Sequence, residues 1–387
     1  MAAAFIGPGT VTACTMAGVD FGFSLLWAML LSIIATYVLQ EMSARLGIIT
    51  QQGLADVIKQ ELSNQWIRNS VIGLIFSAII IGNASYEAGN IGGATLGVEA
   101  LFGMKNSAWY PSLLGLVAFA LLFFGSYKSL EKVFIFLVLA MSLSFIITAF
   151  LTGPNLWLII KGLFLPTIPE NGVLTIIALV GTTVVPYNLF LHAALVSEKW
   201  KSKNDLKLAQ RDTLVSIVLG GFVSICIIVS AAATKTAEVQ NVLDLAKALE
   251  PLYGSAALYF MGIGLFAAGI TSAITAPLAA AYVANSCFGW KAEYKDWKFR
   301  AIWISILSLG VFFLSFGIKP IEIIKFAQVA NGLLLPIIAI FLLWVVNRNA
   351  VMGLYSNTWI QNVIGLLIII LSLILGVKSI LTVLGMF

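Results

Sequence analysis

Long apolar runs, separated by short polar stretches, form the main pattern of this chain. Most runs are roughly 18 to 25 residues long, the length of helix that crosses about 30 Å of hydrocarbon. The alternation over roughly ten residues that marks an outer-membrane β-barrel is absent from the sequence. The pattern predicts an all-α polytopic membrane protein with about eleven transmembrane helices, over residues 2–16, 22–47, 66–103, 108–125, 131–152, 173–198, 209–233, 253–287, 299–317, 321–346 and 358–385.

Composition and charge agree with this pattern. The chain is 60% hydrophobic and 10% charged, whereas about a quarter of the residues in soluble domains are charged. If the N-terminus is cytoplasmic, the inside loops hold 15 of the 22 Lys and Arg residues, as the positive-inside rule requires. The net charge of +5 then follows from topology, so we expect a lipid bilayer and no nucleic acid as the surroundings of this single transmembrane domain, residues 1–387. We expect a multi-pass protein of the plasma membrane, in a prokaryote the inner membrane.

Two of the apolar runs contain helix breakers. The first is Gly7-Pro8-Gly9-Thr10, and the second extends over residues 181–188 around Pro186. Proline removes a backbone donor and glycine frees the local dihedral angles, and an unwound backbone persists at membrane depth only where it lines a cavity or is buried in protein. The breaks open the first and sixth spans, which are equivalent places in two five-helix halves and indicate the substrate site of an inverted-repeat transporter. We place the repeats at about residues 1–152 and 173–346, with an additional helix over 358–385.

The start of the chain carries its own expectation. Only six residues precede Gly7, fewer than a half-helix leading into such a break needs. We expect that the chain begins inside that half-helix or carries a shortened one. No cleavable signal peptide is expected, because the first apolar run leads directly into the break.

Few side chains offer catalytic or metal-binding chemistry. His192 is the one histidine, and Cys14, Cys226 and Cys287 lie in or beside apolar spans without paired spacing, which indicates packing roles. The sequence contains no nucleophile with a base, no phosphate loop and no metal-ligand spacing. We therefore expect neither enzymatic activity nor a cofactor.

The breaks and other ordered motifs resemble the NRAMP family of proton-coupled divalent-metal transporters. Residues 7–10 fall where that family has Asp-Pro-Gly-Asn, and residues 185–192 fall where it has Met-Pro-His-Asn-Leu-Tyr-Leu-His. Gln328, eight residues before Pro336, matches a glutamine of the family's tenth helix that faces the substrate. The resemblance covers nearly the whole chain and implies a leucine-transporter-like 5+5 inverted repeat with discontinuous helices 1 and 6.

The sequence departs from the family at its metal ligands. The resemblance places an aspartate and an asparagine in the first break, and a methionine and an alanine carbonyl in the sixth helix. Here the corresponding residues are Gly7, Thr10, Val185 and Thr182. A buried divalent ion without a carboxylate carries an uncompensated charge, and the soft ligand that favours transition metals is gone. We therefore expect that the chain does not carry the family's metals.

With no charged side chain at the breaks, the backbone predicts a site for a zwitterion. The half-helix that starts near Gly9 presents amides and a positive dipole end to a carboxylate, and the half-helix that ends near Thr182 presents carbonyls to an ammonium group. We expect secondary active symport of a small neutral amino acid or a similar zwitterion. The expected substrate-binding residues are Gly7, Pro8, Gly9, Thr10, Tyr86, Thr182, Val185, Tyr187 and Gln328.

Coupling to H⁺ or Na⁺ is expected to involve other polar residues of the spans. Glu87 is a carboxylate within a span, which is costly and often functional, and the alternative is a structural ion pair. His192 is a weaker candidate for a proton carrier than for a packing residue. Thr271, Ser272 and Thr275 lie where sodium-coupled members of this fold place hydroxyl ligands, and the alternative is helix capping and packing.

Two other functions stay open at this point. One is transport of a hydrated divalent cation, Mg²⁺ or Mn²⁺, bound through water, backbone carbonyls and Gln328. The other is a non-transporting membrane sensor or scaffold, which the retained breaks and the lack of an added soluble domain disfavour.

Overall fold

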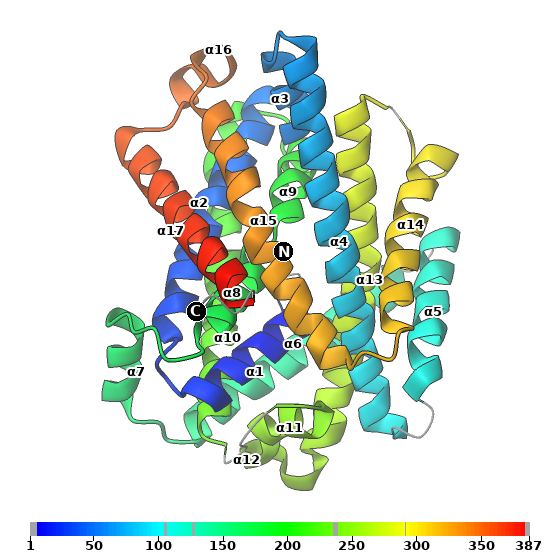
Figure 1. Ribbon diagram of the computed structural model, residues 1–387, viewed down its shortest axis with the longest axis vertical. Helices are drawn as coiled ribbons and strands as arrows, with labels where there is room; N and C mark the ends of the chain where they lie inside the picture. Colours follow the sequence, from blue (N-terminus) through cyan, green and yellow to red (C-terminus); the bar gives the residue numbers. More distant parts are fainter. Residues whose placement is uncertain (1–5, 104–106, 126–127, 235–238, 291, 384–387) are drawn as a thin grey trace.

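The computed structural model describes residues 6–103, 107–125, 128–234, 239–290 and 292–383, and its regular structure is helical throughout these ranges (Figure 1). The first half contains α1 (Pro8–Phe21), α2 (Leu26–Thr50), α3 (Leu54–Glu61), α4 (Gln65–Phe102), α5 (Tyr110–Phe124), α6 (Lys128–Leu151) and α7 (Leu156–Phe164). The second half contains α8 (Val173–Thr183), α9 (Pro186–Lys199), α10 (Leu206–Ala232), α11 (Val242–Ala246), α12 (Glu250–Tyr253), α13 (Ala257–Phe288), α14 (Trp297–Leu314) and α15 (Pro320–Val346), followed by α16 (Asn349–Met352) and α17 (Trp359–Val383).

The predicted spans agree with the long helices. Within the described ranges, nine helices are long and apolar enough to cross a membrane, and α5, with 15 residues, is a shorter apolar helix. The first predicted span, 2–16, is displaced, because α1 begins only at Pro8 and continues to Phe21. The short helices α3 and α7 were not predicted, since neither is long enough to give a membrane-spanning signal.

Small residues allow the helices at the centre to approach closely. A Cβ atom added to Gly269 of α13 would lie 2.5 Å from the amide nitrogen of Ala94 on α4, and one added to Gly97 of α4 would lie 2.5 Å from the amide of Phe266 on α13. In lipid the hydrophobic effect contributes little to the association of helices, so close packing of this kind supplies much of the free energy of their association. Gly89, Gly93 and Gly97, spaced by four residues on α4, likewise pack closely against α15, Pro8 and α13 in turn.

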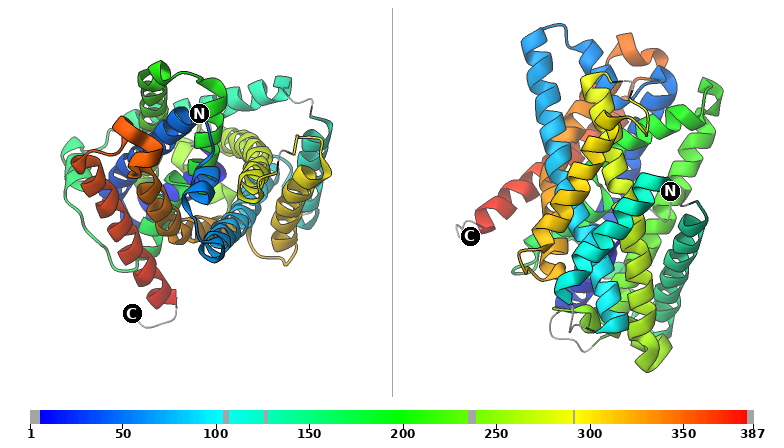
Figure 2. Two further views of the ribbon diagram at one scale, coloured as in Figure 1. Left: turned by 90° about the horizontal axis from the view of Figure 1, so that it is seen from above. Right: turned by 90° about the vertical axis from the view of Figure 1, so that its right-hand side faces the viewer.

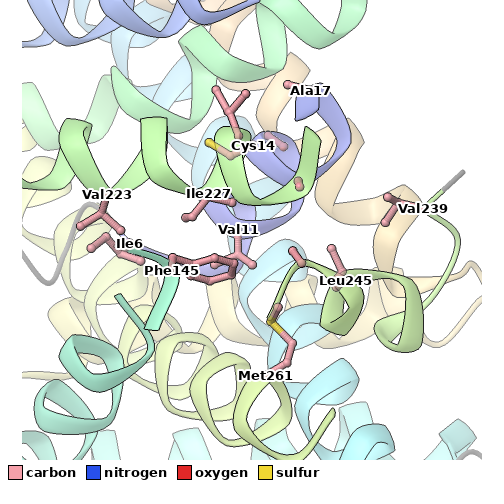
Figure 3. Close-up of a cluster of buried hydrophobic side chains, with 14 of the residues drawn as sticks. Ile6, Val11, Cys14, Ala17, Phe145, Val223, Ile227, Val239, Leu245 and Met261 are labelled. Atoms are coloured by element: carbon pink, nitrogen blue, oxygen red, sulfur yellow. The ribbon is translucent and has the colours of Figure 1, made fainter. Parts of the chain in front are cut away.

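Helix α1 lies inside the bundle and is buried over most of its length. Figure 3 shows Val11, Cys14 and Ala17 packed among Phe145 of α6 and Val223 and Ile227 of α10. This packing fixes a 14-residue helix that is too short to span the bilayer alone.

The two ends of the bundle carry exposed tryptophans. Trp66, Trp297 and Trp359 lie in the first turns of α4, α14 and α17, whereas Trp109 directly precedes α5 and Trp157 lies in the first turn of α7. Helices α4, α14 and α17 begin toward the end of the bundle that holds α3 and α16, and α5 and α7 begin toward the opposite end (Figure 1). Tryptophan concentrates at membrane–water interfaces, so these two sets mark the two faces of the membrane. Figure 2 shows α17 crossing the outside of the bundle, where its large apolar side chains are exposed to lipid.

A buried ion pair ties three parts of the chain together at the α3 end. Arg45 donates from Nε to Glu41 Oε1 (2.9 Å) and from Nη2 to Glu41 Oε2 (3.1 Å). Gln210 of α10 donates to the same carboxylate, and Arg45 also donates to Asn357 Oδ1 before α17. The i,i+4 pair is thus part of a larger network that joins α2, α10 and the segment before α17.

Candidate substrate site between the helix breaks

The first break is the non-helical residue Gly7, directly before α1. Its backbone is extended (φ −93°, ψ 174°), and Pro8 occupies the first helical position, where its missing N–H costs nothing. The first-turn amides that follow have no partner within the helix. The half-helix expected before Gly7 falls on residues 1–5, which lie outside the described residues.

The second break separates α8 from α9. Val184 (φ −97°, ψ 75°) and Val185 (φ −76°, ψ 120°) leave the helical conformation, and Pro186 starts α9. Because residue 186 is proline, the carbonyl of Thr182 has no amide four residues later to pair with. The break therefore presents a backbone oxygen at the position that the sequence predicted.

The two breaks meet each other and α15. The hydroxyl oxygens of Thr10 and Thr182 lie 3.0 Å apart, in a buried hydrogen bond between residues 172 positions apart in the sequence. Gly9 and Gly181 both face Gln328 so closely that a Cβ atom on either would overlap it. Glycine at these two positions is thus what allows both broken helices to contact the same turn of α15.

Aromatic residues form the other side of the site. The rings of Tyr86 on α4 and Tyr187 on α9 lie 5.6 Å apart with an interplanar angle of 67°. A Cβ atom on Gly7 would lie 3.5 Å from both the Tyr86 hydroxyl and the Ser272 hydroxyl of α13. The structure therefore brings Ser272 to the first break, together with Tyr86, while Val185 is buried in the same apolar cluster as the two tyrosines.

Asn331 is a feature of this region that sequence reasoning missed. It lies one turn beyond Gln328 on α15, is 1% exposed, and neither its Oδ1 nor its Nδ2 has a hydrogen-bond partner. Gln328 Oε1 is likewise buried and unpartnered. Buried amide atoms in proteins are nearly always paired, so these groups indicate a place for water or a ligand. The i,i+3 spacing of two amides inside an apolar helix was the available signal.

A cavity of about 280 Å³ lies between α1, α8 and α15 and reaches Gln328. Thr12, Ala178 and Gln328 are among its lining residues. The hydroxyl oxygen of Thr12 is buried and has no partner. Glu322 and Lys325 also line this cavity.

The donors at the breaks are neutral and contain oxygen but no sulfur. Within the described ranges, no group of three or more His, Cys, Asp and Glu side chains is placed to hold a metal ion. The available ligands are hydroxyl, amide and backbone oxygens. Such a site can bind a polar molecule, or a cation that keeps part of its own water.

Four of the five expected coupling residues have their contacts elsewhere than at the breaks: Glu87, His192, Thr271 and Thr275. Glu87 is fully buried, its Cγ packs against Gly310 of α14, and its Oε2 accepts from Asn90 at 3.2 Å. The Nε2 atom of His192 lies 3.2 Å from the Thr213 hydroxyl on α10, and its Nδ1 is buried without a partner.

The hydroxyls of the eighth predicted span divide into two groups. Thr271 and Thr275 donate to carbonyls of their own helix, those of Ala267 and Thr271. Of the three hydroxyl residues considered for Na⁺, the structure therefore places Ser272 alone beside Gly7.

Comparison with known proteins gives a consistent assignment. The family model described as natural resistance-associated macrophage protein-like matches residues 1–382. The chain is 27% identical over 375 residues to the divalent metal cation transporter MntH of Verminephrobacter eiseniae, covering 92% of this chain and 81% of that protein. It is 28% identical over 390 residues to the MntH of Aeromonas hydrophila, covering 97% and 91%.

Solved structures show the same fold. A variant of the manganese transporter of Eremococcus coleocola superposes with a TM-score of 0.79 at 19% identity, covering 98% of this chain and 84% of that one. The nucleobase-cation-symport-1 family transporter Mhp1, closed with bromovinylhydantoin bound, superposes with a TM-score of 0.64 at 16% identity, covering 100% and 92%. The leucine-transporter-like arrangement expected from the resemblance is confirmed.

These relatives correct one expectation from the sequence. Symport of a neutral amino acid or zwitterion, with its H⁺ or Na⁺ coupling ion, is wrong, because the relatives are named as divalent metal cation and manganese transporters. That expectation took the loss of charged ligands to exclude a metal ion. The alternative of a divalent cation agrees better with the relatives, and the expected absence of enzymatic activity agrees with the family.

Proposed function

The chain belongs to the natural resistance-associated macrophage protein-like family, and on that premise we propose that it transports a divalent cation, Mg²⁺ or Mn²⁺, that keeps most of its water shell. The observation that carries the proposal is the neutral, oxygen-lined meeting of the two breaks. The relatives that match nearly the whole length of this chain are named divalent metal cation transporters.

The donor set supports a hard cation. Mg²⁺ takes oxygen ligands and gives up its water reluctantly, whereas thioether and imidazole ligands select transition metals. Val185 and Tyr187 stand where the resemblance places a methionine and a histidine, so the softer donors are missing. The oxygens of Thr10, the Thr182 backbone and Gln328 remain, and we assign them to binding of the hydrated cation. Of the two ions, this set favours Mg²⁺.

Retained water removes the objection that no carboxylate is present. A bare divalent ion at the breaks would face a large desolvation cost without a counter-charge. An ion with six waters keeps its first shell and requires only hydrogen-bond acceptors from the protein. Six waters at about 30 Å³ each take up about 180 Å³, which is less than the cavity of about 280 Å³ that reaches Gln328.

We assign the substrate-binding role to the residues around the breaks, including Asn331 one turn further along α15. Amide oxygens of Gln328 and Asn331 accept hydrogen bonds from the water shell, Gly9 lets Gln328 approach the first break, and Gly7 leaves room beside Tyr86 and Ser272. Tyr86, Tyr187 and Ser272 form the remaining wall. The proposed setting is a bacterial inner membrane with the N-terminus cytoplasmic, which places α3 and α16 inside and α11 and α12 outside.

Uptake into proteoliposomes tests the function. The purified full chain is reconstituted, and influx of Mg²⁺ and Mn²⁺ is followed with enclosed fluorescent indicators beside influx of labelled alanine. Saturable metal influx that Gln328→Ala reduces, with no alanine influx, is the expected result. Alanine influx without metal influx would show the proposal to be wrong, and protein-free liposomes give the leak.

A further inference from the structure

Helix α15 carries four polar side chains, called here the polar ladder, that wind around the helix from its Pro320 end. Glu322, Lys325, Gln328 and Asn331 follow one another at intervals of three residues in an otherwise apolar sequence. Residues three apart are neighbours on a helix, and each step rises about 4.5 Å along its axis. The first three line the cavity between α1, α8 and α15. Each three-residue step also turns by about 60° around the helix axis, so Asn331 lies outside the cavity and faces Gly82 of α4. The ladder thus winds from the Pro320 end of α15 to the unpartnered amide atoms of Gln328 and Asn331.

The first two residues of the ladder, Glu322 and Lys325, form an ion pair. Lys325 Nζ lies 3.1 Å from Glu322 Oε1, and the side chains are 28% and 54% exposed. Among the residues that line the cavity these two are the charged ones. A cation that enters from this end therefore meets one carboxylate and one ammonium group before it meets neutral oxygens.

We propose that Glu322 is the entry ligand of the transport pathway and that Lys325 is a built-in competitor for it. This inference rests on the proposed function. An arriving hydrated divalent cation takes the place of the Lys325 ammonium at the Glu322 carboxylate. The long lysine side chain moves toward solvent, and the cation proceeds to Gln328 and then to Asn331. No covalent bond changes, since one cation replaces another at the same carboxylate.

Charge and flexibility favour this exchange. A divalent ion carries twice the charge of the ammonium group and interacts more strongly with a carboxylate at equal distance. Lysine has a flexible stem and makes a point contact, so its pairing at a partly exposed site is weak. Lys325 also repels cations inside the cavity. Its presence should lower the affinity of entry and prevent the carboxylate from retaining the ion.

A merely local ion pair is the competing explanation. An acidic residue in the first turn of a helix stabilises that helix through its dipole, and a lysine three residues later adds a weak pair. Under this explanation, replacing Glu322 or Lys325 by a neutral residue would lower stability slightly. The two replacements would change transport in the same direction or not at all. The proposed exchange requires opposite effects on the apparent affinity, which separates the two explanations.

The test compares the half-saturation concentration for Mg²⁺ and Mn²⁺ influx in proteoliposomes containing Glu322→Gln, Lys325→Gln or the unchanged chain. We expect Glu322→Gln to raise it by about three- to tenfold, and Lys325→Gln to lower it by about two- to fivefold, at low ionic strength. Both effects should shrink in high salt, while the maximal rate changes little. Glu322→Asp keeps the charge and should stay near the unchanged chain.

Matched controls come from charges outside the cavity on the same proposed side of the membrane. Lys247 forms an i,i+3 pair with Asp244 at the same 3.1 Å distance, and Glu170 is exposed in the loop before α8. Lys247→Gln and Glu170→Gln should leave the half-saturation concentration unchanged. Equal effects of these variants, or a same-sign effect of Glu322→Gln and Lys325→Gln, would overturn the proposal. Absence of metal influx in the unchanged chain would instead overturn the proposed function.

Discussion

Replacing Asn331 by leucine should make the protein more stable and less active. In the folded chain both side-chain polar atoms of Asn331 are buried without a partner. Each such atom costs about 1–3 kcal/mol, so the upper limit for the pair is about 2–6 kcal/mol. A water molecule bound to the side chain would offset part of this cost. We therefore expect Asn331→Leu to raise the free energy of unfolding by about 1–2 kcal/mol.

The same substitution removes an acceptor for the water shell of the ion. One lost hydrogen bond of about 1.4 kcal/mol corresponds to a tenfold change, so we expect the ratio of maximal rate to half-saturation concentration for Mg²⁺ influx to fall by about tenfold. A gain in stability combined with a loss of transport is typical of a residue kept for function.

The chain itself supplies the stability assay. Cys14, Cys226 and Cys287 are free and buried, so a thiol-reactive fluorescent dye reports unfolding in detergent. A gain of about 1 kcal/mol should raise the midpoint temperature by about 2–4 °C. Asn362→Leu is the matched control, because Asn362 is paired with Asn347 and Asn357 and its loss should lower the midpoint. Lower stability of Asn331→Leu, or unchanged transport, would refute the reasoning.

Three further predictions concern other parts of the structure. Thr182→Val removes the hydrogen bond to Thr10 and should cost about 0.5–1.5 kcal/mol, but metal influx should persist, since the proposed ligand is the backbone oxygen; abolished influx would assign that role to the hydroxyl. Arg45→Met should lower the free energy of unfolding by about 3–5 kcal/mol because it leaves Glu41 buried without its cation, and adding Glu41→Leu should restore most of the loss in the dye assay. Burial raises the pKa of Asp56, so the folded state holds this proton more tightly than the unfolded state does. The resulting stability is present at low pH and lost as the pH rises through the folded pKa. The midpoint temperature of Asp56→Asn, measured relative to that of the unchanged chain, should therefore rise from acidic to neutral pH. A difference between the two midpoints that does not change with pH would contradict the assignment.

The sequence contained enough information to place the breaks and most helices. Proline at position 186 cannot continue a helix from Thr182, so the second break follows from covalent chemistry alone. The long apolar runs likewise have one stable form in lipid. The short helices α3 and α7 were missed because they lie at the ends of the bundle, where no run of membrane length marks them.

The orientation of side chains needed the structure. Glu87 and Tyr86 are adjacent in sequence, yet Tyr86 faces the breaks and Glu87 packs against Gly310. That difference depends on how α4 is rotated against its neighbours, which the apolar pattern of a helix buried on several sides does not determine.

The substrate was misjudged for a chemical reason. The prediction compared Gly7, Thr10, Val185 and Thr182 with the family's metal ligands, and took the missing carboxylate and thioether to exclude the family's metals. Gln328 was included among the substrate-binding residues and in the hydrated-cation alternative, whereas Asn331, whose amide atoms are buried without partners, was not considered.

Competition by hexaamminecobalt(III) tests most directly whether the cation keeps its shell. This ion holds six non-exchanging ammonia ligands whose N–H groups point outward like the hydrogens of coordinated water, and it cannot shed them to reach a protein oxygen. The account predicts that it competes with Mg²⁺ influx in proteoliposomes, and that Gln328→Ala and Asn331→Leu weaken its inhibition. Strong influx of Mg²⁺ or Mn²⁺ that hexaamminecobalt(III) leaves unchanged would mean that the ion is stripped of water at the breaks, contrary to the account.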